Sequence, residues 1–126
     1  MNREGFEGLV TWAIEALPSE FKLSLENVDV VVQDWPIRNQ LVRLRSRSRF
    51  GLLGLYEGVP QTARTTNYNL VPPDKITIFQ KPIEAICRSE NEIGLEIQRV
   101  IQHEIAHHFG ISDQKLRLIE RRKSRR

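Results

Sequence analysis

The sequence predicts a single α+β domain in which a small mixed β-sheet of three or four strands packs against helices. A length of 126 residues fits one domain. A hydrophobic fraction of 40% and a charged fraction of 28% are typical of a soluble globular protein. The patterns run from one helix through several strands to further helices, without regular strand–helix alternation. We expect this domain to span residues 1–119, followed by a basic tail at 120–126.

The first third of the chain begins with a helix and then a strand. Residues 4–17 place apolar side chains at helical spacing, and Pro18 is expected to end the helix. Residues 28–33 are rich in valine and predict a strand. Residues 41–50 alternate arginine with other residues, which permits either an exposed edge strand or an arginine–serine loop. The apolar residues of the first helix are Phe6, Leu9, Val10, Ala13, Ile14 and Leu17.

The middle of the chain predicts two further strands. Residues 52–57 and 75–80 are apolar runs bounded by glycine or proline. Residues 61–73, which lie between them, are polar and contain proline, so we expect a loop. The segment at 52–57 permits two interpretations: an ordinary core strand, or a strand whose edge accepts an extended peptide.

The last third of the chain predicts helices. Residues 82–88 suggest a short helix, and residues 90–109 predict a long one that ends at Gly110. A last short helix is expected to start at Ser112 or Asp113. The apolar face of the long helix contains Ile93, Ile97, Val100, Ile101 and Ile105.

Basic residues are concentrated in two segments of a chain whose formal net charge is +3. Residues 38–49 carry five arginines and no acid, and residues 117–126 carry six basic residues and one acid. The remainder has 8 basic and 15 acidic residues, so the high isoelectric point belongs to these two segments. They could contact a nucleic acid or an acidic partner weakly, or lie free in solvent. The residues concerned are Arg43, Arg45, Arg47, Arg49 and the tail at 121–126.

The cysteine content and the hydropathy predict a cytoplasmic protein. Cys87 is the single cysteine, so no internal disulfide can form, and a reducing compartment is the simplest interpretation. Charges interrupt every long apolar stretch, so we expect no transmembrane helix and no membrane partner. The first ten residues mix acidic and basic side chains and do not predict a signal peptide.

The segment HEIAHHFGISD at residues 103–113 contains the pattern H-E-x-x-H. His103 and His107 are four residues apart, so on a helix they share one face and can bind one metal ion. Glu104 lies about 100° further round the helix, beside that ion, where its carboxylate can accept a proton from a metal-bound water. The alternative is a helix whose histidines pack or face solvent.

A zinc site needs a third protein ligand, and Asp113 is the candidate. Gly110 can end the helix and turn the chain so that the Asp113 carboxylate returns towards the metal. Asp113 could instead cap the following helix, and the two roles are compatible because they can use different oxygens. His108 faces away from the proposed ligands, so we expect it to pack or to support the site, and we expect Phe109 in the core.

Five segments resemble a family of small bacterial zincin-like metallopeptidases. They are LPSEF (17–21), NVDVVVQDWP (27–36), LLGLYEGVPQTAR (52–64), PDKITIFQKPIE (73–84) and HEIAHHFGISD (103–113). The resemblance covers roughly residues 6–118. It implies a minimal zincin-like fold, His103, His107 and Asp113 as ligands of one zinc ion, Glu104 as the general base, and a peptide or protein substrate.

The leading hypothesis is therefore zinc-dependent hydrolysis of peptide bonds. The donor that would stabilise the tetrahedral oxyanion is not identified, and Tyr56, Tyr68 and Arg64 are candidates. One alternative is a metal-dependent RNA-processing hydrolase that uses the arginine-rich segments, and another is a non-catalytic metal-binding interaction module. Two histidines and one carboxylate can also bind Fe²⁺.

Overall fold

The computed structural model describes residues 1–43, 51–58, 73–109 and 118, and it confirms the α+β class. Three strands form a mixed sheet in the order β1-β3-β2. β1 (Val28–Gln33) and β3 (Asp74–Phe79) are parallel, with Val28 opposite Asp74. β2 (Gly54–Glu57) is antiparallel to β3, with Gly54 opposite Ile78. Within the described residues, β2 pairs on one side only and forms an edge of the sheet.

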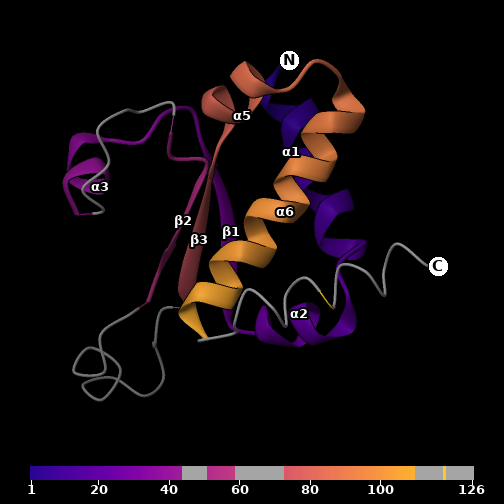
Figure 1. Ribbon diagram of the computed structural model, residues 1–126, viewed down its shortest axis with the longest axis vertical. Helices are drawn as coiled ribbons and strands as arrows, with labels where there is room; N and C mark the ends of the chain where they lie inside the picture. The colour runs from indigo at the N-terminus through magenta and orange to yellow at the C-terminus, as the bar shows by residue number, and fades with distance from the viewer. Residues whose placement is uncertain (44–50, 59–72, 110–117, 119–126) are drawn as a thin grey trace.

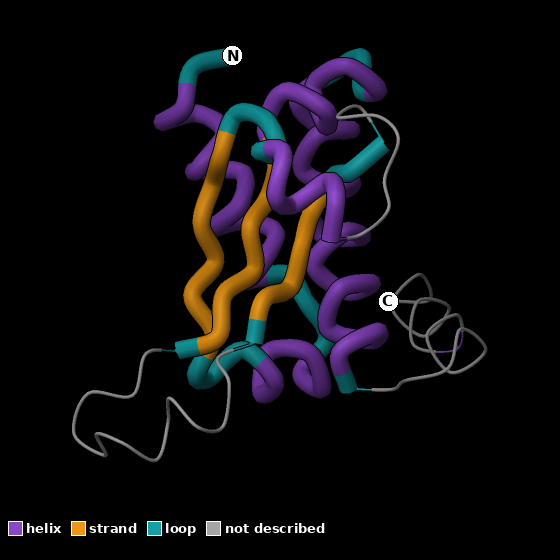
Figure 2. Tube along the Cα trace, turned by 90° about the vertical axis from the view of Figure 1, so that its left-hand side faces the viewer, coloured by secondary structure: helices purple, strands orange, loops and turns teal. Residues whose placement is uncertain are grey.

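Helices cover one face of this sheet. Three helices lie together on that side: α1 (Arg3–Glu15), α2 (Ser19–Ser24) and α6 (Glu90–His108). α6 runs diagonally along the sheet (Figure 1). The view turned by 90° shows the three strands side by side in front of these helices (Figure 2). α3 (Arg38–Arg43) lies on the other side of the sheet (Figure 1).

The core fills the space between the sheet and the helices. Isoleucines at alternate positions of β3 and at helical spacing on α6 meet two buried phenylalanines from α1 and α2. Burial of each such side chain contributes about 1.5–3 kcal/mol to folding. The fully buried members are Phe6, Phe21, Ile76, Ile78, Ile97, Ile101 and Ile105.

The predicted elements agree with the observed ones where an apolar pattern was present. The strand predicted at 28–33 has those bounds, and the helix predicted at 90–109 extends from Glu90 to His108. The strand predicted at 75–80 forms one residue earlier, and the strand predicted at 52–57 begins only at Gly54. The first helix ends at Glu15, two residues earlier than predicted, and a second helix, α2, which was not predicted, starts directly after Pro18.

Two of the other expectations need correction. Residues 41–43 are the last turn of α3 and not an edge strand. The side-chain oxygen Oε1 of Gln40 accepts hydrogen bonds from the Ile37 backbone amide at 2.8 Å and from the Gln33 side chain at 3.1 Å, which fixes the start of this helix. The short helix expected at 82–88 is α5 (Gln80–Ile86), which starts earlier because a proline is tolerated in a first turn. The remainder of 41–50, most of the loop expected at 61–73 and the helix expected after Ser112 lie outside the described residues.

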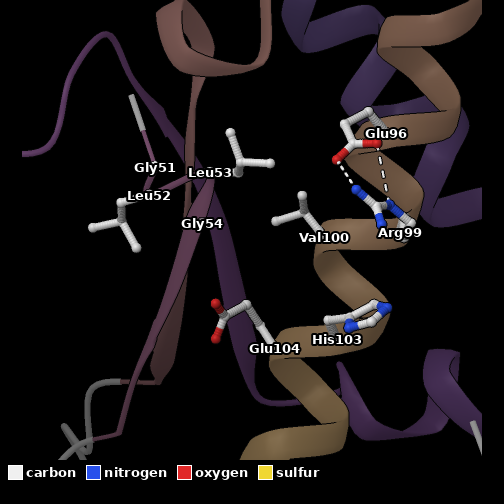
Figure 3. A pocket seen from close by; sticks show the side chains of 9 residues that line it. All are labelled: Gly51, Leu52, Leu53, Gly54, Glu96, Arg99, Val100, His103 and Glu104. Carbon is white, nitrogen blue, oxygen red and sulfur yellow. Dashed lines mark hydrogen bonds and ion pairs between the residues drawn. The ribbon is translucent and has the colours of Figure 1, made fainter. Parts of the chain in front are cut away.

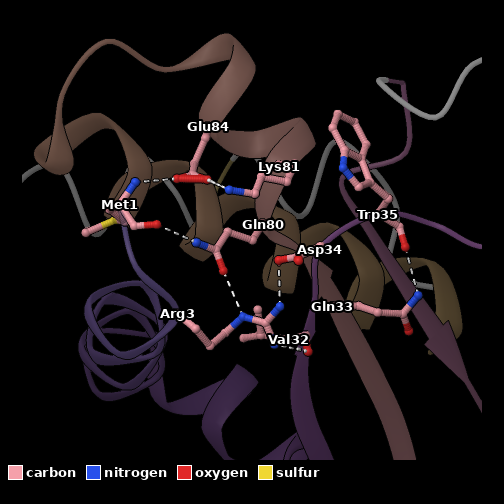
Figure 4. Close-up of polar contacts among 9 residues, drawn as sticks. All are labelled: Met1, Arg3, Val32, Gln33, Asp34, Trp35, Gln80, Lys81 and Glu84. Carbon is pink, nitrogen blue, oxygen red and sulfur yellow. Dashed lines mark hydrogen bonds and ion pairs between the residues drawn. The ribbon is translucent and has the colours of Figure 1, made fainter.

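Polar contacts close the end of the sheet where β3 leads into α5 (Figure 4). The Arg3 guanidinium donates to the Gln80 side chain at 2.9 Å and to Asp34 at 2.6 Å. The Gln80 side-chain amide donates to the Met1 backbone carbonyl at 3.0 Å, and the Met1 amino group lies 2.9 Å from the Glu84 carboxylate. These contacts join the start of α1 to β1 and α5.

Candidate active site

Helix α6 carries the H-E-x-x-H pattern over its last two turns. Ser89 caps its start by accepting a hydrogen bond from the Glu92 amide at 3.2 Å. The Glu92 carboxylate accepts in return from the Arg88 amide at 2.7 Å. Residues three and four apart on this helix form two neighbouring rows of side chains, which we call stripes. One contains Glu96, Arg99, His103 and His107, and the other contains Val100, Glu104 and His108.

The two predicted metal ligands on the first stripe are adjacent. The ring centroids of His103 and His107 are 6.2 Å apart, and the ring planes are nearly perpendicular, at 89°. Two imidazoles on one tetrahedral zinc have centroids roughly 5 Å apart, given Zn–N bonds of about 2.0–2.1 Å. A modest side-chain rotation therefore makes the pair suitable for zinc. His107 is exposed and His103 partly buried, so an ion could reach them from solvent.

The third predicted ligand, Asp113, lies outside the described residues. In the described ranges, no group of three or more histidine, cysteine, aspartate or glutamate side chains is arranged to bind a metal. Two neutral nitrogen donors and one carboxylate nevertheless form a donor set that zinc accepts. The role of Asp113 therefore stays a prediction.

Glu104 lies on the second stripe, partly buried between α6 and β2. Burial raises the pKa of its carboxyl group, while the neighbouring His107 charge and a hydrogen bond from the Tyr56 backbone amide act in the opposite direction. A carboxylate with a raised pKa is a better proton acceptor near neutral pH. The surroundings of Glu104 therefore suit a general base.

A pocket of about 230 Å³ lies between α6 and the start of β2. Glu104 and His103 lie at one end of it, and a Glu96–Arg99 ion pair of 2.6 Å lies at the other (Figure 3). This volume is smaller than that of a typical drug-sized ligand site, so it suits one side chain of a larger ligand. The rest of the lining is Gly51, Leu52, Leu53, Gly54 and Val100.

The backbone of β2 presents polar groups towards this pocket. The Phe79 amide donates to the Leu53 carbonyl at 3.0 Å, which fixes the register of the antiparallel pair. Because hydrogen-bonded positions alternate in such a pair, Gly54 and Tyr56 direct their backbone groups away from β3. The Tyr56 amide thereby reaches Glu104.

An aromatic cluster at the end of α6 was not predicted as a unit. The Tyr56 ring stacks on His108 at a centroid distance of 3.8 Å, which agrees with the packing role expected for His108. Phe109 is 52% exposed and contacts this cluster edge-on, so its expected place in the core was wrong. It follows the last helical turn, where the side chain turns from the core to the Tyr56 ring. Spacing on α6 alone gave no signal for this cluster.

Of the other candidate residues, the structure describes Tyr56 and Cys87. The Tyr56 hydroxyl donates to Asp74 at 2.7 Å, so it is committed away from the pocket and its role as an oxyanion donor is not supported. Tyr68, Arg64, most of the arginine-rich segment and the basic tail lie outside the described residues. Cys87 ends α5 and packs partly buried against the core.

The sequence matches the family described as zincin-like metallopeptidase over residues 25–123. The chain belongs to the zincin-like metallopeptidase family. Membership in this family implies a bound metal, with zinc the expected ion, and peptides or proteins as substrates. A comparison with curated proteins found no match to the chain. None of the helices in the described part has the length and apolar character that a bilayer span requires.

Proposed function

We propose that the chain is a zinc-dependent metallopeptidase in which Glu104 is the general base. The proposal depends chiefly on one observation: two adjacent stripes of α6 bring His103 and the partly buried Glu104 carboxylate to one end of a pocket, and the His107 ring lies 6.2 Å from that of His103. His103, His107 and Asp113 would hold the ion. Zinc, when bound, supplies a Lewis acid that polarises a carbonyl and acidifies water.

In this proposal, Glu104 carries the proton during hydrolysis. Glu104 is poised to accept a proton from water, because burial raises the pKa of its carboxyl group. The same carboxyl can then donate this proton to the amine that leaves when the peptide bond breaks. The Tyr56 amide holds the carboxylate in place between these two transfers.

The substrate would bind as an extended strand beside β2. Gly54 offers backbone groups on the outer edge of β2, which pairs with no other strand among the described residues, and an extended peptide can form main-chain hydrogen bonds there. One side chain of the peptide would occupy the pocket of about 230 Å³ lined by Leu52, Leu53 and Val100. Affinity for the peptide would thus come from its backbone hydrogen bonds, and preference for one side chain over another would come from the pocket.

The decisive experiment replaces the carboxylate and keeps the helix. Glu104→Gln is expected to retain stoichiometric zinc and to lose about 10²–10⁴-fold in kcat on a fluorogenic peptide library. Glu90→Gln, the same chemical change at an exposed position of α6, should match the parent. Equal turnover by Glu104→Gln and the parent contradicts the general-base role. A zinc-loaded parent that cleaves no peptide would favour a non-catalytic metal-binding module.

A further inference from the structure

The side chain of Tyr56 is held on three sides. Its ring is nearly parallel to the His108 ring, with centroids 3.8 Å apart and an interplanar angle of 16°. The Phe109 ring meets it edge-on at 6.4 Å and 81°. The first contact covers one face of the Tyr56 ring, and the second is the edge-on arrangement that aromatic pairs prefer. The end of α6 therefore fixes the position of the Tyr56 ring.

The hydroxyl of the same side chain is fixed to the sheet. It donates to Asp74, the first residue of β3, at 2.7 Å. A Cβ atom at Gly58 would lie 3.5 Å from His108 and 3.8 Å from Asp74, so this corner is closely packed. Tyr56 thus joins the edge strand to both β3 and α6.

The backbone of Tyr56 contacts the proposed general base. Its amide donates to the Glu104 carboxylate. Val100, Glu104 and His108 are spaced by four residues, so they form one stripe of α6. Gly54 meets Val100 at one end of this stripe, and the Tyr56 ring meets His108 at the other. Strand β2 is therefore attached to α6 on both sides of Glu104.

We infer that Tyr56 is a positioning residue: through His108 and Asp74 it fixes β2 against α6, and its amide holds the Glu104 carboxylate in one orientation. This inference rests on the proposed function. A glutamate side chain has several rotatable bonds, so an unrestrained carboxylate would leave the productive orientation. Misplacement of a reacting group by about 1 Å can cost roughly 10²-fold in rate.

The first test compares two replacements of His108. His108→Ala removes the stacked ring, and His108→Phe keeps a flat ring in its place. We expect His108→Ala to lower kcat about tenfold to a hundredfold per bound zinc, with KM within about twofold of the parent. His108→Phe should recover most of this loss. Asn91→Ala, at an exposed position of the same helix, is the matched control and should equal the parent.

Three results would overturn the inference. One is an unchanged kcat per bound zinc in His108→Ala. Another is a His108→Phe variant that is as slow as His108→Ala. The third is a rise in KM without a fall in kcat, because that result would assign the stack to substrate binding and not to the orientation of Glu104.

A second test does not depend on catalysis. Hydrogen exchange of the Tyr56 amide, measured by NMR, should be at least about tenfold faster in His108→Ala than in the parent, and unchanged in His108→Phe and Asn91→Ala. If the parent cleaves no peptide but exchange responds as expected, the positioning contact stands and the proposed function fails. If exchange is unchanged in His108→Ala, the positioning role fails whatever the activity.

Discussion

The two ends of the sheet use polar side chains differently. At the end near α5, charges meet opposite charges, as in the Met1–Glu84 and Arg3–Asp34 pairs (Figure 4). At the other end, Glu104 is held by a backbone amide and its pKa is raised by burial. Paired charges stabilise a fold but are chemically inert, whereas a partly desolvated carboxylate retains its capacity to accept a proton. We therefore distinguish a structural end of the sheet, joined by ion pairs, from the end that carries the proposed general base.

The largest expected effect concerns the metal. Asp113→Asn keeps a residue that caps a helix well but removes the carboxylate. Zinc affinity, measured by competition with a chromogenic chelator, should fall at least about tenfold. Mutation of residues that only hold a zinc ligand in place already costs about that much, so loss of a ligand should cost no less. Ser112→Ala is the neighbouring control and should bind zinc like the parent. Unchanged affinity in Asp113→Asn would make Asp113 a cap alone.

A smaller effect, on the stability of the fold, is expected at Gly54, where β2 lies close to α6 between the two ends of the sheet. A Cβ atom at Gly54 would lie 2.4 Å from Val100 Cγ1 and 3.3 Å from the Thr77 carbonyl oxygen. Gly54→Ala should therefore lower the free energy of unfolding by about 1–3 kcal/mol in urea denaturation. Val100→Ala should lower the free energy of unfolding less in the Gly54→Ala background than in the parent, because it removes the methyl groups that would clash with Ala at position 54. Additive losses in the double variant would show that no clash exists.

At the structural end, the loss should appear in stability and not in zinc binding. Gln80 is 2% exposed and bonds to both Arg3 and the Met1 carbonyl. Gln80→Ala should lower the free energy of unfolding by about 1–3 kcal/mol, because it removes two hydrogen bonds that contribute about 0.5–1.5 kcal/mol each. Zinc affinity should stay that of the parent. Asp34→Ala breaks an exposed pair and should cost at most about 1 kcal/mol. A Gln80→Ala variant with weakened zinc binding would contradict the separation of the two ends.

The smallest expected effect concerns the rate at which the Cys87 thiol reacts. Burial raises the pKa of the Cys87 thiol, and the nearby Glu96 and Glu92 carboxylates add to the rise. A higher pKa means less thiolate at any pH below it, so alkylation by iodoacetamide at pH 8 should be slower in the folded protein than in urea. The measurement is the rate of mass increase by mass spectrometry. Equal rates would mean that the thiol is as reactive as in the unfolded chain.

Hydrophobic patterns within a segment predicted the strands and helices that such patterns determine. The valine run at 28–33 gave β1, and the isoleucine spacing on α6 gave the long helix. α2 was missed because six residues carry little periodicity, and its Phe21 side chain is buried by distant elements. α3 was missed because its start depends on Gln33 and Gln40, which belong to different elements.

The candidate site divides in the same way. Spacing alone predicted that His103 and His107 share a face of α6 with Glu104 beside them. The pocket and the stack of Tyr56 on His108 could not be predicted, because both require β2 to lie against α6. A contact between residues that are far apart in the sequence leaves no periodic trace in either segment.

The shortness of β2 has a consequence for association. An exposed strand edge can recruit identical copies of a protein into larger assemblies, and cells guard against this with brief strands and charges that face inward. β2 has four residues, and one of its outward amides already bonds to the Glu104 carboxylate. Among the described residues, so short an outer edge gives a second copy few main-chain hydrogen bonds, whereas the proposed peptide substrate needs to bind only briefly. The described part of β2 thus offers a second copy of the chain little to pair with.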